Sequence, residues 1–307
     1  MRGGSGSGGD VDEPGGELLE PASDDDLLTG GTRTDGGVAH LLADENRPGG
    51  FLLTLDRIRQ SYVDLDDPSY LDFEYLQGFA DVVDATFDPG RRLDVTHIGG
   101  GALAFPRFLR HTRPGSSQIV LEPDAALTAF VRSRLPLPPR SGIRVRATFG
   151  RPGLTALGDA SADLVVLDAF AGGRVPADLT TAEATAEVVR VLRPDGLYLL
   201  NIADGPPLDY SKRVLATLRA AFAHVLVRTD PAVLRPRRFG NLVVAASAAP
   251  LPYTEVTRRA HGAPFPTSVV RGARLAGLAG AARPLTDADP LRSPNPIELA
   301  WRVDGGW

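Results

Sequence analysis

The stretch LDVTHIGGGALAF, residues 93–105, decides the fold of this chain. Residues 93–98 predict a buried strand, and the residues after the three glycines predict a helix over 102–111. Glycine lets the backbone pass close to a ligand, and the first turn of a helix presents backbone N–H groups without partners. A strand, a glycine loop and a helix in this order therefore predict a binding site for an anion or a nucleotide.

An acidic residue closes the next predicted strand, residues 118–122. Glu122 follows the glycines by about 20 residues, the spacing at which a carboxylate accepts hydrogen bonds from ribose hydroxyls in nucleotide-binding βαβ units. We therefore predict that Gly99, Gly100, Gly101 and Glu122 bind a nucleoside.

Two nucleoside ligands fit this pattern. The run GGGALA, residues 99–104, satisfies the G-x-G-x-x-A fingerprint of dinucleotide sites, which favours NAD. The alternative is S-adenosylmethionine or its decarboxylated form. Residues 222–228 and 240–246 predict a closing β-hairpin at the end of the sheet. Such a hairpin is typical of the methyltransferase-type sheet, so it favours S-adenosylmethionine or its decarboxylated form over NAD.

Apolar strands alternate with helices through the middle of the chain, which is typical of a parallel sheet covered on both faces. We predict an α/β fold with a Rossmann-like class I methyltransferase sheet of seven strands, mostly parallel, the last one antiparallel. Besides the two strands above, the sheet contains residues 143–147, 164–168, 197–201, 225–228 and 241–246. A small N-terminal β-element, residues 51–55 and 61–65, precedes a helix that Ser69 caps.

The ends of the chain differ from its middle in composition. Residues 1–36 are rich in Gly, Ser and acidic residues, without a periodic apolar face, so we predict a disordered acidic tail. Residues 37–90 hold the N-terminal β-element and its helix. Residues 91–250 form the Rossmann-like nucleoside-binding domain, and residues 251–307, rich in Pro and Arg, are expected to wrap its surface.

Composition excludes several classes of protein. The 307 residues contain no cysteine, which excludes disulfide scaffolds, thiolate zinc sites and cysteine nucleophiles. The 5 histidines show no ligand spacing, so we expect no metal. No apolar run reaches the ~18 residues of a membrane span, and no clustered basic face suggests nucleic acid. We therefore expect a cytoplasmic protein with neither membrane nor nucleic acid as a partner.

Several motifs resemble the polyamine aminopropyltransferases, the spermidine synthase family. The resemblance extends from about residue 50 to residue 250. It rests on Gln60, HIGGG (97–101), VLEPD (120–124), VVLDAF (165–170) and RVLRPDGLYLLNI (190–202). It implies that the protein transfers an aminopropyl group from decarboxylated S-adenosylmethionine to an amine, with Gln60 as a further nucleoside contact. A homodimer is an assembly that the resemblance allows.

Asp168 is the predicted catalytic residue. It ends the fourth strand, at the edge where open α/β sheets bind ligands. The resemblance implies that this aspartate accepts a proton from the attacking amine. An ammonium group has no lone pair, so the amine must lose a proton before it attacks the carbon beside the sulfonium.

Three positions differ from the family pattern. Ala171 replaces the second carboxylate of a D-x-x-D-P motif, which holds the diamine in the family. Phe149 stands where an aspartate binds the adenine amino group, and it remains able to stack on the base. Arginines in residues 235–240 replace a stretch rich in tyrosine and proline, and an arginine cluster facing the site would repel a polyamine.

Two other functions therefore stay open. One is a methyltransferase that uses S-adenosylmethionine on an acceptor other than a polyamine. The other is a degenerate family member without catalytic activity.

Overall fold

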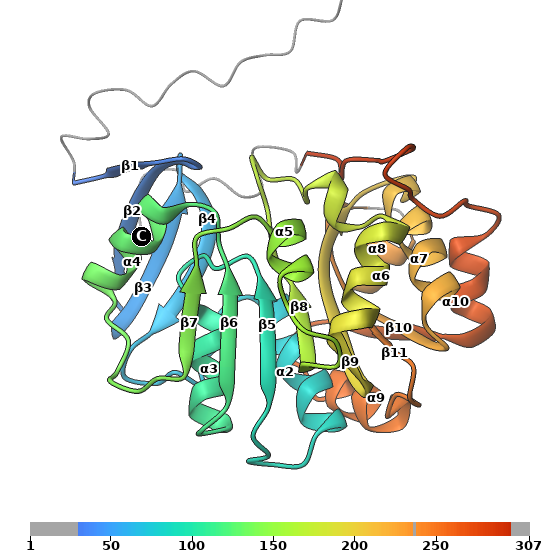
Figure 1. The fold of residues 1–307 in the computed structure, drawn as a ribbon, viewed down its shortest axis with the longest axis horizontal. Helices are drawn as coiled ribbons and strands as arrows, with labels where there is room; N and C mark the ends of the chain where they lie inside the picture. Colours follow the sequence, from blue (N-terminus) through green and yellow to red (C-terminus); the bar gives the residue numbers. More distant parts are fainter. Residues whose placement is uncertain (1–29, 236–237, 296–307) are drawn as a thin grey trace, which may run out of the picture.

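The computed structural model describes residues 30–235 and 238–295. Its strands form two sheets (Figure 1). The smaller sheet is antiparallel, in the order β1-β2-β3-β4. Its strands are β1 (Thr32–Thr34), β2 (Gly37–Asp44), β3 (Arg47–Leu55) and β4 (Ile58–Asp64). The predicted N-terminal β-element is therefore confirmed, with two more strands than the sequence indicated.

The larger sheet has the order β12-β10-β11-β9-β8-β5-β6-β7. Strands β5 to β9 are parallel, whereas β11 runs antiparallel to both of its neighbours and β12 antiparallel to β10. The predicted class I methyltransferase-like sheet is confirmed. The strands are β5 (Asp94–Ile98), β6 (Ser117–Leu121), β7 (Ile143–Arg146), β8 (Ala162–Leu167), β9 (Leu192–Asp204), β10 (His224–Thr229), β11 (Gly240–Ser247) and β12 (Ser268–Arg271).

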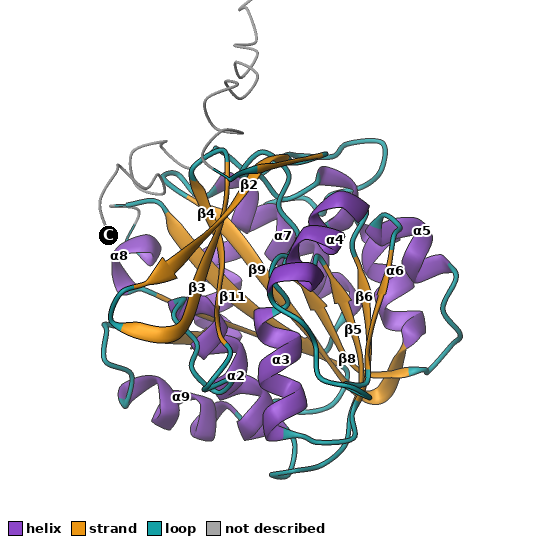
Figure 2. Cartoon of the chain, turned by 90° about the vertical axis from the view of Figure 1, so that its left-hand side faces the viewer, coloured by secondary structure: helices purple, strands orange, loops and turns teal. Residues whose placement is uncertain are grey.

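Helices cover both faces of the larger sheet, which explains why β8 is buried along its whole length. The first face carries α2 (Glu74–Thr86), α3 (Ala104–Thr112), α4 (Ala125–Arg134) and α9 (Tyr253–His261), and their apolar side chains form one core with the small sheet. In Figure 2 the small sheet lies on this same side. The second face carries α5 (Gly150–Thr155), the short helix η1 (Ala177–Leu179), α6 (Ala182–Val191), α7 (Asp209–Ala221) and α10 (Gly272–Ala279). Helix α8 (Pro231–Leu234) precedes β11.

The C-terminal region departs from the seven-strand prediction. Residues 263–278 carry weak helical signals, and α10 at Gly272–Ala279 agrees with them, but Ser268–Arg271 forms β12, which makes the described sheet eight-stranded. The two buried valines of this short strand, Val269 and Val270, pair with β10. A run of four residues between arginines and prolines shows too little alternation to predict a strand from the sequence.

The N-terminal boundaries also differ from the prediction. β1 lies inside the stretch predicted to be disordered, and residues 1–29 of that stretch lie outside the described residues. Helix α2 begins at Glu74, not at Ser69. Asp67 explains this difference, because its carboxylate accepts hydrogen bonds from both the N–H and the hydroxyl of Ser69.

Candidate active site

The carboxyl ends of the parallel strands meet at one edge of the larger sheet, the upper edge in Figure 1. From β5 the chain proceeds outward through β6 and β7, and from β8 it proceeds the other way through β9. The strand order therefore reverses between β5 and β8. Open α/β sheets bind ligands in the crevice at such a switch point.

The glycine loop occupies this switch point. Gly99 has a φ of 98°, and a methyl group added there would collide with the backbone carbonyl of Asp168. Gly101 also has a positive φ, and the Ser61 side chain lies against it. Only glycine allows the end of β5 to approach the residue after β8 this closely.

Glu122 holds the glycine loop in place. Its Oε2 accepts a hydrogen bond from Gly100 N–H at 2.9 Å, and its Oε1 accepts one from Asp124 N–H at 3.0 Å. Burial raises the pKa of Glu122, and these backbone hydrogen bonds oppose the rise. Each carboxylate oxygen has two lone pairs, so both retain capacity for a further donor such as a ribose hydroxyl.

The two other predicted contacts, Gln60 and Phe149, come before and after the glycine loop in the sequence. Gln60 is half-buried on β4, next to Ser61, whose side chain lies against Gly101. Phe149 follows β7 at the carboxyl edge, and its side chain is 69% exposed. A large exposed aromatic ring at this edge is suited to stacking on a base.

Asp168 lies directly after β8. Its Oδ2 accepts a hydrogen bond from the Tyr75 hydroxyl at 3.0 Å, and its Oδ1 accepts one from Asn201 Nδ2 at 3.0 Å. Burial raises the pKa of Asp168 to about 6, although the bonds from Asn201 and Tyr75 lower it. A carboxylate with this pKa is ionised at neutral pH and able to accept a proton there.

The structure brings most of the predicted site residues together. Backbone contacts join the loop to both flanking strands: Gly99 N–H donates to the Leu121 carbonyl at 3.0 Å, and Asp168 N–H donates to the Ile98 carbonyl at 2.9 Å. The three glycines, Glu122 and Asp168 therefore form one cluster. Gln60 adjoins it through Ser61, while Phe149 shares only the sheet edge.

Two partners of Asp168 were missed from the sequence, Tyr75 and Asn201. Burial raises the pKa of Tyr75 well above its ordinary value, and the Asp168 carboxylate raises it further, so the hydroxyl stays protonated and donates. Asn201 is a polar residue within the apolar run 197–203 of β9, which is a signal that sequence reasoning could have used. Tyr75 offers no comparable signal, because an aromatic residue on a helix usually packs in the core.

The two described arginines of residues 235–240, Arg235 and Arg238, both have partners within the chain. Arg238 makes an ion pair with Asp230 at 3.1 Å, and the Arg235 Nε donates to the Pro231 carbonyl. Residues 236–237 lie outside the described residues.

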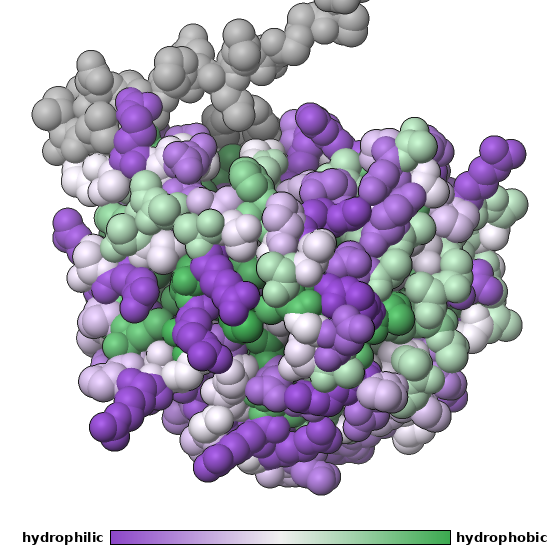
Figure 3. Space-filling view, viewed as in Figure 1, coloured by the Kyte–Doolittle hydropathy of each residue, from purple (hydrophilic) through white to green (hydrophobic). Residues whose placement is uncertain are grey.

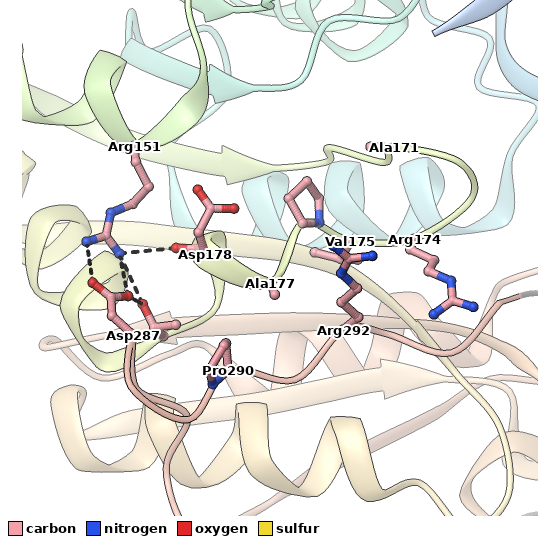
Figure 4. Close-up of a pocket in the computed structure, with 11 residues that line it drawn as sticks. Arg151, Ala171, Arg174, Val175, Ala177, Asp178, Asp287, Pro290 and Arg292 are labelled. Atoms are coloured by element: carbon pink, nitrogen blue, oxygen red, sulfur yellow. Dashed lines mark hydrogen bonds and ion pairs between the residues drawn. The ribbon is translucent and has the colours of Figure 1, made fainter. Parts of the chain in front are cut away.

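A separate cavity of about 590 Å³ lies beside the loop that follows Asp168 (Figure 4). The loop from Ala171 to Asp178 forms one wall, and residues 287–292 form another. Arg151 spans the cavity's end, with hydrogen bonds to Thr181 Oγ1 and to both carboxylate oxygens of Asp287. None of the predicted site residues lines this cavity, although Ala171 of its wall is only three residues from Asp168.

The described part of the chain holds no group of three or more His, Cys, Asp or Glu residues that could bind a metal. Among the described helices, none is long and apolar enough to cross a membrane. The face shown in Figure 3 mixes hydrophilic side chains with smaller hydrophobic areas.

Comparisons with known proteins find a polyamine aminopropyltransferase and spermidine synthases among the similar proteins. No protein-family model matches the chain. Over 142 residues, the chain is 25% identical to a polyamine aminopropyltransferase of Chromobacterium violaceum. This match covers 46% of the chain and 53% of the relative, so it spans about half the relative's length.

Solved structures extend the likeness over more of the chain. The fold is similar to that of a probable spermidine synthase from Corynebacterium glutamicum, with a TM-score of 0.78 and 29% identity. This likeness covers 84% of the chain and 95% of that protein. A spermidine synthase in complex with the transition-state analogue AdoDATO shares the fold at a TM-score of 0.55 and 15% identity, over 73% of this chain and 75% of that one.

Proposed function

We propose that this chain, which is spermidine synthase-like in sequence and fold, transfers an aminopropyl group to an amine acceptor. The donor is decarboxylated S-adenosylmethionine. The observation that carries this proposal is the contact between the glycine loop and Asp168, because it would bring a half-buried carboxylate beside a nucleoside bound at that loop. AdoDATO, which one structural neighbour binds, is an adenosyl compound of the same class.

The proposed site has a place for each part of the donor. Glu122 would accept hydrogen bonds from the ribose hydroxyls, and Gly99–Gly101 would let the nucleoside approach the backbone. Phe149 would stack on the adenine, and Gln60 would add a polar contact from β4. The donor's sulfonium and the carbons beside it would then lie near Asp168.

The reaction is a displacement at carbon. The acceptor nitrogen's lone pair forms a bond to the carbon beside the sulfonium, the C–S bond breaks, and methylthioadenosine leaves with the bond's electrons. This lone pair is free because the acceptor's ammonium group first gives a proton to the Asp168 carboxylate. General-base catalysis of this kind contributes roughly 10²–10⁴-fold to a rate.

The acceptor is expected to differ from a conventional diamine. In the loop after Asp168, Ala171 and Arg174 pair through their backbones and close a turn. The turn, residues 171–174, contains no acidic residue and so supplies no second carboxylate. A second ammonium group would lose a charge-assisted partner there. We infer that the acceptor has one amine that matters for binding.

The test is an assay of the purified chain with decarboxylated S-adenosylmethionine and a panel of monoamines and diamines. We expect methylthioadenosine and an aminopropylated amine by mass spectrometry. Parallel reactions with S-adenosylmethionine examine the rival function, and a methylated product there would replace aminopropyl transfer with methyl transfer. Binding of neither donor nor methylthioadenosine in calorimetry would support a degenerate, non-catalytic protein.

Asp168→Asn tests the base directly. Asparagine keeps the size of the side chain but accepts no proton, so turnover should fall roughly 10²–10⁴-fold. Donor affinity should change far less, because its contacts are assigned to the glycine loop and Glu122. Activity within a few-fold of the unsubstituted protein would remove Asp168 as the base, and a sharp fall in melting temperature would assign it a structural role.

A further inference from the structure

Both oxygens of Asp168 are held by side chains from distant parts of the chain. Tyr75 on α2 donates to Oδ2, and Asn201 on β9 donates to Oδ1. Asp168 has therefore one fixed donor on each oxygen. The remaining lone pairs are available for the proton that the proposed reaction delivers.

Asn201 stands in surroundings that favour an apolar residue. Its side chain is 2% exposed, and it lies on the sheet face shared with Leu199 on β9 and Val243 opposite it on β11. Its Nδ2 reaches Asp168, but its Oδ1 is buried without a hydrogen-bond partner among the described residues. Leaving a buried acceptor unpaired is unfavourable for folding.

An asparagine at this place is therefore not explained by packing. A valine or leucine would fill the same face without an unpaired acceptor. The single interaction that the side chain makes in return is its hydrogen bond to Asp168. Residues that reduce stability while they hold a reactive group are typical of functional sites.

We propose that Asn201 is a positioning residue, which holds the Asp168 carboxylate in the orientation and charge state that proton acceptance requires. The proposal rests on the proposed function, in which Asp168 is the base. The amide N–H donor stabilises the carboxylate more than the protonated acid. The bond also fixes the plane of the carboxylate, because Oδ1 and Oδ2 are each tied to a different element.

Two side chains hydrogen-bond to the Asp168 carboxylate and thereby affect its pKa, Tyr75 and Asn201. Tyr75 is the titratable side chain that contacts the carboxylate, and it stays protonated because burial raises its pKa. Burial by itself raises the pKa of Asp168, and the two donors oppose the rise. Loss of the Asn201 donor therefore raises the Asp168 pKa above about 6, toward neutral pH.

Asn241 provides a matched control. It lies on β11 opposite Ala203, on the same sheet face as Asn201, and its Oδ1 is likewise buried without a partner in the described part of the chain. No hydrogen bond joins it to Asp168 among the described residues. Asn241→Val therefore removes a half-buried amide, with a buried unpaired Oδ1 like that of Asn201, without a change at Asp168.

The experiment compares Asn201→Val, Asn201→Thr and Asn241→Val. Valine and threonine have nearly the same shape, but only threonine keeps a donor. The pKa of Asp168 is measured in the ligand-free protein by ¹³C NMR of labelled aspartate carboxyls, assigned with Asp168→Asn. A lost bond to a charged group is expected to raise this pKa by about 1–2 pH units in Asn201→Val.

The pH–rate profile gives a second readout. Because the base must be ionised, kcat/KM rises with pH through the Asp168 pKa. A rise of about 1–2 units lowers kcat/KM of Asn201→Val about 5- to 50-fold at pH 6, with recovery above pH 9. Asn201→Thr should lie nearer to the unsubstituted protein, and Asn241→Val should match it. The melting temperature of Asn201→Val should be unchanged or higher.

The titrations of the variants either support or overturn the positioning role of Asn201. An Asp168 titration unchanged in Asn201→Val, or shifted equally in Asn241→Val, overturns the proposal. If the valine chain does not fold, Asn201→Ala removes the donor without adding a branched side chain and is judged by the same titration. If the proposed transfer reaction is absent, the NMR titration still reports whether Asn201 governs Asp168, so the two failures are distinguishable.

Discussion

Glu122 and Asp168 are both half-buried carboxylates that directly follow strands, and partial burial raises the pKa of each. The two carboxylates differ in the hydrogen-bond donors that they contact, and this difference suits them to different roles. Glu122 is bound by backbone N–H groups of Gly100 and Asp124, which are fixed by the fold. Asp168 is bound by two side chains, which can be replaced without a change of backbone. Glu122 is therefore suited to hold the glycine loop in place and to bind a ligand, and Asp168 is suited to exchange a proton.

Glu122→Ala should weaken the binding of methylthioadenosine by ~2–3 kcal/mol, because two charge-assisted hydrogen bonds to the ribose are lost. This corresponds to roughly a 30- to 150-fold higher dissociation constant by calorimetry. Asp178→Ala, a carboxylate of the separate cavity, serves as the control and should bind normally. An unchanged dissociation constant in Glu122→Ala would exclude Glu122 from the nucleoside site.

At the scale of elements, residues 280–295 fasten two helices of the second face. Leu285 is fully buried, its N–H donates to Thr217 Oγ1 on α7, and its carbonyl accepts from Ala182 N–H at the start of α6, both at 2.8 Å. Arg213 on α7 donates to the carbonyls of Arg283 and Pro284. The segment expected to wrap the surface thus contributes a core residue and backbone pairing.

Leu285→Ala should lower the free energy of unfolding by about 2–5 kcal/mol, because it leaves a cavity between α6 and α7. Leu291→Ala is the control from the same segment, and its half-buried side chain should make the loss smaller. Denaturant unfolding measures both. Equal losses for the two variants would show that Leu285 is not a core residue.

At the scale of the whole molecule, Asp124 ties the small sheet to the large domain. Its Oδ1 caps α4 by accepting from Leu127 N–H at 2.7 Å, and its Oδ2 accepts from Gly36 N–H at 2.9 Å. Gly36 belongs to the turn between β1 and β2. The small sheet, which carries Gln60 and Ser61, is thereby held over the glycine loop.

Deletion of residues 1–29 should leave the melting temperature and donor binding unchanged, because their composition offers no apolar face to bury. Extending the deletion to residue 36 removes β1 and the Gly36–Asp124 bond. The longer deletion should cost about 1–3 kcal/mol of stability. Calorimetric melting of both deletions checks this, and equal melting temperatures would show that β1 contributes nothing.

Features that depend on local pattern could be predicted from the amino-acid sequence. The strand, the glycine loop and the helix of residues 93–111 follow from periodicity and from the conformational freedom of glycine. The parallel sheet follows from its uniformly apolar strands. Asp168 and Glu122 could be selected because each ends such a strand, and strand ends gather at one edge of a sheet.

The surroundings of these residues depend on how distant elements pack, so they could not be predicted from the sequence. Tyr75 lies 93 residues from Asp168 in the chain and Asn201 lies 33 residues from it, and no local pattern encodes either contact. β12 and Leu285 likewise take their places through partners far away in sequence. Periodicity reports which face of an element is buried, whereas hydrogen-bond partners depend on how the elements pack.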